Sequence, residues 1–283
     1  MLIKDNLYKE ITPNGYGIAI ETEGELLYSK QSEFQSVEIF KSKGLGNVLT
    51  LDGLMMTTVE DEFFYHEMIT HIPLCSHKNP ENVLVIGGGD GGTVREVLKH
   101  DTVKNVDLCE IDGLVIEASK EFLPSIAGKL DDKRVNIYVE DAIEFIKDKK
   151  NCYDVVLIDS TDPMGPGEGL FTEEFYTNVK ESLKEGGIVT PQSESPFANK
   201  NEMRKMYILL NKVFNTVKPY AGPIPTYPGG YWSWAFCSVE NDNSIKDIER
   251  AKKIESISKL YNTELHSGAF CVPTFVRKIA NNE

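Results

Sequence analysis

A glycine-rich turn near residue 87 is the first feature of the sequence that could bind a ligand. The apolar run Val83–Ile86 leads directly into Gly87–Gly92, in which Gly87, Gly89 and Gly92 have the spacing G-x-G-x-x-G. Such glycines let the backbone turn tightly and approach a nucleotide, and Glu110, about twenty residues further on, could accept both hydroxyls of a ribose. The same spacing can also mark only a tight strand-to-helix turn.

Asp90 lies inside this turn, where the pyrophosphate of a dinucleotide would lie against a helix N-terminus. Two like charges about 4 Å apart at an effective dielectric constant of 20 repel by roughly 4 kcal/mol. Asp90 therefore argues against NAD and favours a cationic ligand, such as a sulfonium nucleoside that carries a free amine. The alternative is that Asp90 only caps the following helix.

Two further acidic segments follow predicted strands. In Glu140-Asp141-Ala142, the Asp141 carboxylate could accept the exocyclic amine of adenine or begin a helix. The segment Asp159–Pro166 (Asp-Ser-Thr-Asp-Pro-Met-Gly-Pro) directly follows the apolar run Val155–Ile158. Because ligands of open α/β sheets bind beyond the carboxyl ends of the strands, two acids three positions apart on this loop indicate a functional site. The loop Asp162–Gly169 is expected to act as a lid.

Other patterns indicate neither a metal site nor nucleic-acid binding. His66 and His71 are five positions apart instead of four, so they would not share a helix face as the histidines of zinc proteases do. The five cysteines include no Cys-x-x-Cys pair and are expected to be reduced, mostly buried thiols. A formal net charge of −14 argues against nucleic acid and anionic membranes as partners. Trp232 and Trp234 are expected to be core or pocket wall.

The elements that must position these residues divide the 283-residue chain into three parts. Residues 1–58 contain short β-branched and aromatic runs broken by turn residues, which predicts a small antiparallel β domain. A helix is predicted from Val59 to Ile72, with Pro73 just past its end, within a linking segment 59–80. From 81 to 283 the pattern alternates between strand, turn and helix, which predicts an α/β domain with a mostly parallel sheet and helices on both faces.

The expected strands are Gly17–Glu21, Glu25–Tyr28, Ser36–Phe40, Asn47–Leu51, Val83–Ile86, Val106–Glu110, Val135–Val139, Val155–Ile158 and Gly187–Pro191, with Phe214–Pro219 and Tyr231–Ser238 as a hairpin at one edge. No apolar run is long enough to span a membrane, and the N-terminus lacks the apolar core of a signal peptide. A cytoplasmic location is therefore expected.

Four segments together resemble the spermidine synthases, the polyamine aminopropyltransferases: Asp61–Glu67, Gly87–Gly92, Asp159–Pro166 and Pro225–Pro228. The resemblance extends from about Tyr16 to Phe275 and is similar to the bacterial type, because His66 stands where some eukaryotic members have Gln. It implies a seven-stranded methyltransferase-like (Rossmann-like) domain after the small β domain, and a homodimer or homotetramer.

The resemblance also implies a reaction: transfer of the aminopropyl group of decarboxylated S-adenosylmethionine to putrescine by direct displacement, giving spermidine and methylthioadenosine. No metal or cofactor is implied, since the sulfonium nucleoside is a co-substrate. Asp159 would accept the proton and Tyr65 would support the attacking amine. The implied diamine-binding residues are His66, Asp90, Asp159, Asp162, Gln192, Glu194 and Tyr227. The implied donor-binding residues are Gln35, Gly87, Gly89, Asp90, Glu110, Asp141, Ala142 and Pro166.

Three alternatives stay open at this point. The acceptor could be cadaverine, agmatine or spermidine, because pocket length is not visible in the sequence. An S-adenosylmethionine methyltransferase would share the sheet and Glu110, but its methionine carboxylate would have to lie close to Asp90. A polyamine-binding protein could keep the acidic pocket without the donor site.

Overall fold

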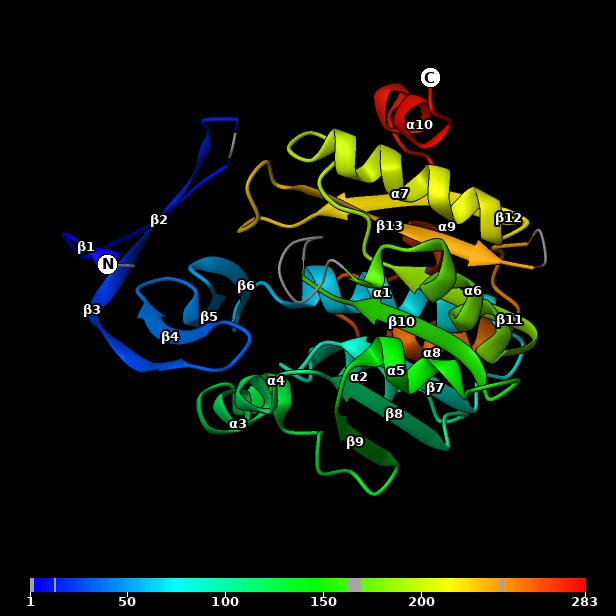
Figure 1. Cartoon of the computed structure of the whole chain (residues 1–283), viewed down its shortest axis with the longest axis horizontal. Coiled ribbons are helices and arrows are strands. Elements are labelled where there is room, and N and C mark those ends of the chain that lie inside the picture. The colour runs from blue at the N-terminus through cyan, green and yellow to red at the C-terminus, as the bar shows by residue number, and fades with distance from the viewer. Residues whose placement is uncertain (1–2, 13, 162–168, 240–241) are drawn as a thin grey trace.

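The computed structural model describes residues 3–12, 14–161, 169–239 and 242–283, and it contains two β-sheets joined by a long helix (Figure 1). Within these residues, no helix combines the length and the apolar character needed to cross a membrane.

The N-terminal sheet is an antiparallel meander in which each strand pairs with the next along the chain. Its strands are β1 (Ile3–Lys4), β2 (Leu7–Ile11), β3 (Gly17–Gln31), β4 (Ser36–Ser42), β5 (Gly46–Leu51) and β6 (Leu54–Thr58). The antiparallel unit is confirmed, but β1, β2 and β6 were not predicted. The expected break between the strands Gly17–Glu21 and Glu25–Tyr28 is also wrong. β3 runs through it as one strand, because a register shift after Thr22, with Gly24 at φ +109°, absorbs the irregularity as a bulge.

The connecting helix α1 (Phe63–Ser76) differs at both ends from the predicted Val59–Ile72. The N–H of Val59 still donates to the carbonyl of Asn47, so this residue extends the strand ladder and the helix begins later. Pro73 lies inside the helix and not beyond it. Only one helical hydrogen bond is lost there, and the residues that follow, Leu74 and Cys75, are fully buried.

The second sheet has seven strands in the order β12-β13-β11-β10-β7-β8-β9. Their bounds are β7 (Asn82–Gly87), β8 (Asn105–Glu110), β9 (Val135–Val139), β10 (Tyr153–Asp159), β11 (Leu183–Pro191), β12 (Thr216–Pro223) and β13 (Tyr231–Ser238). All pairs among β11, β10, β7, β8 and β9 are parallel, whereas β12 and β13 form an antiparallel hairpin at one edge. This confirms the predicted mostly parallel sheet and its edge hairpin.

Helices cover both faces of this sheet, as expected (Figure 1). Besides α1 they are α2 (Gly92–Val97), α3 (Gly113–Phe122), α4 (Pro124–Ala127), α5 (Ala142–Lys147), α6 (Glu173–Ser182), α7 (Lys200–Val213), α8 (Ile248–Glu255), α9 (Thr263–Gly268) and α10 (Thr274–Ala280). Alternate residues of β7 point to opposite faces: Leu84 and Ile86 pack with α5, α6, α7 and α10, whereas Val83 and Val85 pack with α1 and α2. Val37 and Leu49 of the N-terminal sheet pack against α3.

The strand order reverses between β7 and β10. From β7 the chain proceeds through β8 to β9 on one side, and from β10 to β11 on the other. The two strands end level with one another, with Gly87 opposite Asp159. In an open α/β sheet this reversal point leaves a crevice beyond the carboxyl ends of the strands, where ligands bind.

Candidate active site

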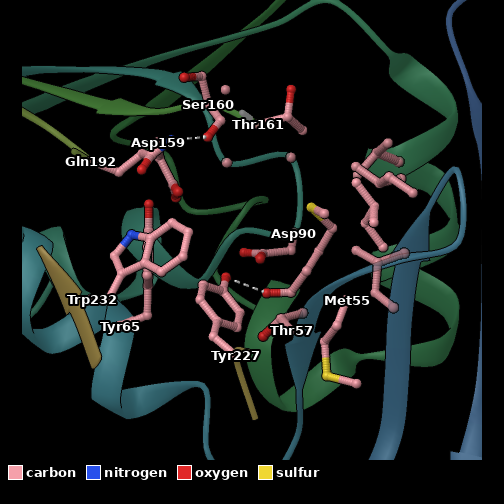
Figure 2. A pocket seen from close by; sticks show the side chains of 18 of the residues that line it. Met55, Thr57, Tyr65, Asp90, Asp159, Ser160, Thr161, Gln192, Tyr227 and Trp232 are labelled. Atoms are coloured by element: carbon pink, nitrogen blue, oxygen red, sulfur yellow. Dashed lines mark hydrogen bonds between the residues drawn. The ribbon is translucent and has the colours of Figure 1, made fainter. Parts of the chain in front are cut away.

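A cavity lies at this reversal point and is closed from the side by the N-terminal domain (Figure 2). The sheet contributes the β7–α2 turn and the ends of β8 and β10, while α1 contributes Tyr65 and His66. The N-terminal strands add an apolar wall that includes Leu49, Leu51 and Met55. The residues that form the site therefore come from both sheets. Predicted site residues that line the cavity are Gln35, Tyr65, His66, Gly87, Gly89, Asp90, Glu110, Asp141, Ala142, Asp159, Gln192 and Tyr227.

The glycines of the turn let two carboxylates lie directly against the backbone. Gly88 has φ +67°, and a Cβ there would come within 2.7 Å of Oδ2 of Asp159. A Cβ on Gly89 would come within 2.9 Å of Cγ of Glu110. Both contacts are closer than atoms can pack, so any larger residue would displace a carboxylate. The turn thus serves to hold acidic groups at the cavity edge.

Asp159 stands at the end of β10 and accepts a hydrogen bond of 2.6 Å from the Thr93 hydroxyl at Oδ2. Its carboxylate also interacts with the Tyr65 hydroxyl, and both side chains point into the cavity (Figure 2). Burial and the charge of Asp90 raise the pKa of Asp159 above its usual value, while His66 and the two hydroxyls act in the opposite direction. A buried carboxylate with a raised pKa is a better proton acceptor than one in water.

Asp90 faces the same cavity (Figure 2). Its Oδ1 accepts a hydrogen bond of 2.7 Å from the N–H of Gly92, and Nε2 of His66 lies 3.4 Å from the same oxygen. Burial acts to raise the pKa of Asp90, but His66 and the Gly92 N–H outweigh burial and lower it. Asp90 is therefore ionised. It accepts the N–H of the first residue of α2 and also faces the cavity, so both alternatives drawn from the sequence stay open.

Glu110 ends β8, and its two carboxylate oxygens accept hydrogen bonds from the N–H groups of Gly89 (3.1 Å) and Asp112 (2.9 Å). Burial outweighs these donors and raises the pKa of Glu110 to about 7. Asp141 is the N-cap of α5, since its carboxylate accepts the N–H of Ile143 at 2.8 Å. It also lines the cavity.

The N-terminal domain reaches the side of the cavity near Glu110 through Gln35. The amide Nε2 of this buried side chain donates to Oδ2 of Asp112 at 3.1 Å, which ties the residue before β4 to the N-cap of α3. Gln35 could therefore contact a ligand that also contacts Glu110.

Tyr227 is positioned by hydrogen bonds that join the segment Pro225–Pro228 to the segment Asp61–Glu67. The hydroxyl and the N–H of Thr226 both donate to Oδ2 of Asp61, at 2.6 and 3.1 Å. The Tyr227 hydroxyl donates to the carbonyl of Met56 at 2.7 Å, and the side chain lines the cavity. Trp232 lines the cavity beside Tyr227 and Trp234 is fully buried, which confirms the expectation of pocket wall and core.

Glu194 is not among the residues that line the cavity, and its role in diamine binding stays a prediction. It lies three residues beyond the end of β11 at Pro191, with φ +70°. Its carboxylate accepts hydrogen bonds from the amides of Asn199 (2.6 Å) and Gln192 (3.3 Å), both of which line the cavity. Glu194 thus orients two lining residues. Asp162 and Pro166 lie outside the described residues, as does most of the expected lid.

Three residues of the site were missed: Thr93, Glu62 and Arg95. Thr93 directly follows the glycine turn, a position at the start of α2 from which a hydroxyl can reach the adjoining strand ends. Glu62 precedes His66 by four positions, the spacing at which helix side chains meet. Arg95 donates two hydrogen bonds to Glu62, at 2.7 and 2.9 Å, and no pattern in the sequence indicates this pair.

Comparisons with known proteins match both parts of the chain. Residues 62–247 match the family described as spermine/spermidine synthase domain, and residues 7–59 match the one described as spermidine synthase tetramerisation domain. The polyamine aminopropyltransferase of Alkaliphilus oremlandii is 48% identical over 261 residues, which cover 91% of this chain and 92% of that protein. The protein of the same name from Clostridium perfringens is 46% identical over 260 residues, with the same shares covered.

Solved structures agree with these matches. A spermidine synthase crystallised in complex with the transition state analogue AdoDATO superposes with a TM-score of 0.95 at 42% identity, covering 100% of this chain and 97% of that chain. The spermidine synthase from Thermotoga maritima gives a TM-score of 0.91 at 40% identity with the same coverage.

Proposed function

This chain belongs to the spermine/spermidine synthase family and is an aminopropyltransferase, and we propose that it transfers the aminopropyl group of decarboxylated S-adenosylmethionine to putrescine, giving spermidine and methylthioadenosine. One observation carries the choice of substrates: Asp90 and Asp159 face a single cavity whose adjoining strand end carries Glu110. Two carboxylates suit two amine groups, and the third suits a ribose.

In this proposal the donor lies along the ends of β7, β8 and β9. Glu110 accepts the ribose hydroxyls, while Asp141 and Ala142 contact the adenine. Asp90 holds the amine of the aminopropyl group. The remaining nucleoside contacts are proposed for Gln35, Gly87, Gly89 and Pro166. The side chains of Leu49 and Leu51 support this placement, because they provide an apolar wall for the nucleoside.

The acceptor is proposed to enter with one amine at Asp159 and the other near Tyr227 and Asp162. A primary amine with a pKa of about 10.4 costs roughly 4.6 kcal/mol to deprotonate at pH 7, so a proton acceptor is needed. Tyr65 supports this step, because burial and the Asp159 charge raise the pKa of its hydroxyl well above the usual range and keep it a neutral hydrogen-bond donor.

The proposed chemistry is a single displacement. The amine nitrogen transfers one proton to Asp159 and forms a bond to the carbon next to the sulfonium. The carbon–sulfur bond breaks, and its electron pair stays on sulfur, so methylthioadenosine leaves as a neutral thioether. The donor is a co-substrate, and the displacement needs no cofactor. The site contributes mainly orientation and proton removal.

We also propose that the chain works as a homo-oligomer, a dimer or a tetramer. The support is the match of residues 7–59 to a domain described by its role in tetramerisation. Leu26 and Leu27 of β3 and Ile11 of β2 are exposed on this domain, as expected of residues that a second copy would cover.

Calorimetric titration with methylthioadenosine and with putrescine tests the proposed function. An aminopropyltransferase binds both ligands, and each should bind more tightly in the presence of the other. A methyltransferase for another substrate would ignore putrescine, and a polyamine-binding protein would ignore the nucleoside. Either of these results would overturn the proposal.

A further inference from the structure

A row of charged side chains of alternating sign runs from the cavity into the protein between α1 and α2. Asp90 faces the cavity, and Nε2 of His66 lies 3.4 Å from it. Nδ1 of His66 lies 2.6 Å from Glu62, which accepts hydrogen bonds from Arg95. Arg95 continues the row to Glu96 at 2.8 Å. Carboxylate, imidazole, carboxylate, guanidinium and carboxylate therefore follow one another.

His66 is unusual because it is the positively charged member of this row that lines a cavity proposed to bind cations. Its side chain is only 3% exposed and lies between two carboxylates. Burial alone would lower its pKa, but Asp90 and Glu62 outweigh burial and raise the pKa well above the usual value. A buried imidazolium would repel an incoming ammonium group, so His66 needs a purpose other than the direct diamine contact that the resemblance implies for it.

The neighbouring carboxylates supply that purpose. Asp90 and Asp159 share the cavity, and the charge of Asp90 raises the pKa of Asp159. Two carboxylates in one buried site tend to keep one proton between them. A positive charge at His66 opposes the retention of this proton, because it stabilises the ionised forms of both Asp90 and Asp159.

We propose that Glu62, held in place by Arg95, is a positioning residue that keeps His66 as an imidazolium directed at Asp90, so that Asp90 and Asp159 are both ionised before substrate binds. The consequence of this arrangement for catalysis rests on the proposed function, whereas the ionisation of His66 can be tested independently of that function.

Gly92 is the second support for this geometry. A Cβ at Gly92 would lie 2.2 Å from Cε1 and 2.3 Å from Nδ1 of His66. The imidazole therefore lies flat against the first residue of α2, and the absent side chain makes room for it. The other charged or titratable groups around the ring are Arg95 of α2, Asp159 of β10 and Tyr65, whose ring lies 5.5 Å away.

The test is an NMR titration of the histidine side chains in the intact protein, with His66 assigned by its loss in His66→Gln. In the parent, His66 should remain an imidazolium from pH 6.5 to 8.5. In Glu62→Gln its pKa should fall by about 1–3 units, the usual effect of one opposite charge at this distance. A neutral His66 in the parent at pH 7.5 would by itself overturn the proposal. An unchanged pKa of His66 in Glu62→Gln would also overturn it.

Kinetics of the same variant test the consequence for the carboxylates. A neutral His66 should raise the pKa that governs the acid limb of kcat/KM by about one unit, so kcat/KM falls about 10-fold below that pKa and converges with the parent at high pH. An altered His66 pKa with an unchanged acid limb would overturn the role in positioning. Loss of all transfer activity in the parent would instead count against the proposed function.

Glu67→Gln is the matched control. Glu67 follows His66 on the same helix, is equally buried and accepts three backbone N–H groups of residues 259–261. Its substitution should lower stability and leave both the His66 pKa and the acid limb unchanged. If Glu62→Gln does not fold, Gly92→Ala provides a second variant. Its added Cβ should push the ring from Asp90 and shift the acid limb in the same direction, while alanine is tolerated in a helix.

Discussion

The Thr93 hydroxyl donates a hydrogen bond of 2.6 Å to Oδ2 of Asp159, across 66 residues of sequence. Thr93 belongs to the first turn of α2, whereas Asp159 ends β10. The contact fixes the carboxylate against the glycine turn and stabilises its ionised form. The basicity of the proposed proton acceptor is thus set partly by a residue next to the glycine turn.

Replacing Thr93 with valine keeps the shape of the side chain and removes the donor. A hydrogen bond to a charged group contributes about 1.5–3 kcal/mol, so the pKa of Asp159 should rise by about 1–2 units. Because a higher pKa leaves more of Asp159 protonated at a given pH, kcat/KM should fall about 10-fold at the acid end and recover at alkaline pH. A pH–rate profile measures this. A uniform loss at every pH would show that Thr93 acts on shape alone.

The variant Asp159→Asn tests the proton acceptor itself. It preserves the size of the side chain and removes the basic oxygen, so turnover should fall about 10²–10⁴-fold, the usual effect of losing a general base. The affinity for the donor nucleoside should change much less. Single-turnover kinetics together with calorimetry separate the two effects. Turnover within a few-fold of the parent at pH 7 would mean that another group removes the proton.

Glu110 predicts a pH dependence of nucleoside binding. Burial raises its pKa to about 7, and only the ionised form would accept both hydroxyls of the proposed ribose. The affinity for methylthioadenosine should therefore increase as the pH rises from 6 to 8, and it should level off above the pKa of Glu110. Calorimetry across this range provides the measurement. The variant Glu110→Gln should bind methylthioadenosine weakly, and its affinity should no longer depend on pH. If the pH dependence persists in this variant, it comes from another group.

Asp90 predicts discrimination between two donors. In intact S-adenosylmethionine a carboxylate is attached to the carbon that bears the amine, so it must lie near Asp90. At about 4 Å and an effective dielectric constant of 20 the repulsion is roughly 4 kcal/mol, and after relaxation the parent should still prefer the decarboxylated donor by at least about 10²-fold. The substitution Asp90→Asn should weaken the binding of the decarboxylated donor. It should also reduce the ratio between the affinities for the decarboxylated and the intact donor. Calorimetry on the parent and the variant measures this ratio of affinities. If the ratio is unchanged, Asp90 only binds the N-terminus of α2 and does not discriminate between the donors.

Much of the site was predictable because it depends on local spacing. The glycine turn, Glu110 and Asp159 each follow an apolar strand directly, and the carboxyl ends of parallel strands necessarily meet at one edge of a sheet. The strands of the second sheet were predicted for the same reason: fully buried strands such as β10 are short, continuous apolar runs between turn residues.

The rest depends on how distant elements cross, which no local pattern contains. The contact between His66 and Asp90 requires α1 to pass over Gly92, and the apolar wall at Leu49 requires the N-terminal sheet to dock beside the cavity. The length of β3 was missed because a bulge and a turn use the same residue types. The contacts of Glu194 with Gln192 and Asn199 were not predictable, because its left-handed backbone breaks the alternation that a strand would continue.

Product analysis tests the central claim most directly. The parent enzyme is offered decarboxylated S-adenosylmethionine together with equal amounts of putrescine, cadaverine, agmatine and spermidine, with Asp159→Asn as the control, and the products are identified by mass spectrometry. We expect spermidine as the main product, matched mole for mole by methylthioadenosine, and almost no product from the control. A main product derived from another amine would contradict the assignment of putrescine, and amines unchanged in mass, with no methylthioadenosine released, would contradict the proposed use of the decarboxylated donor.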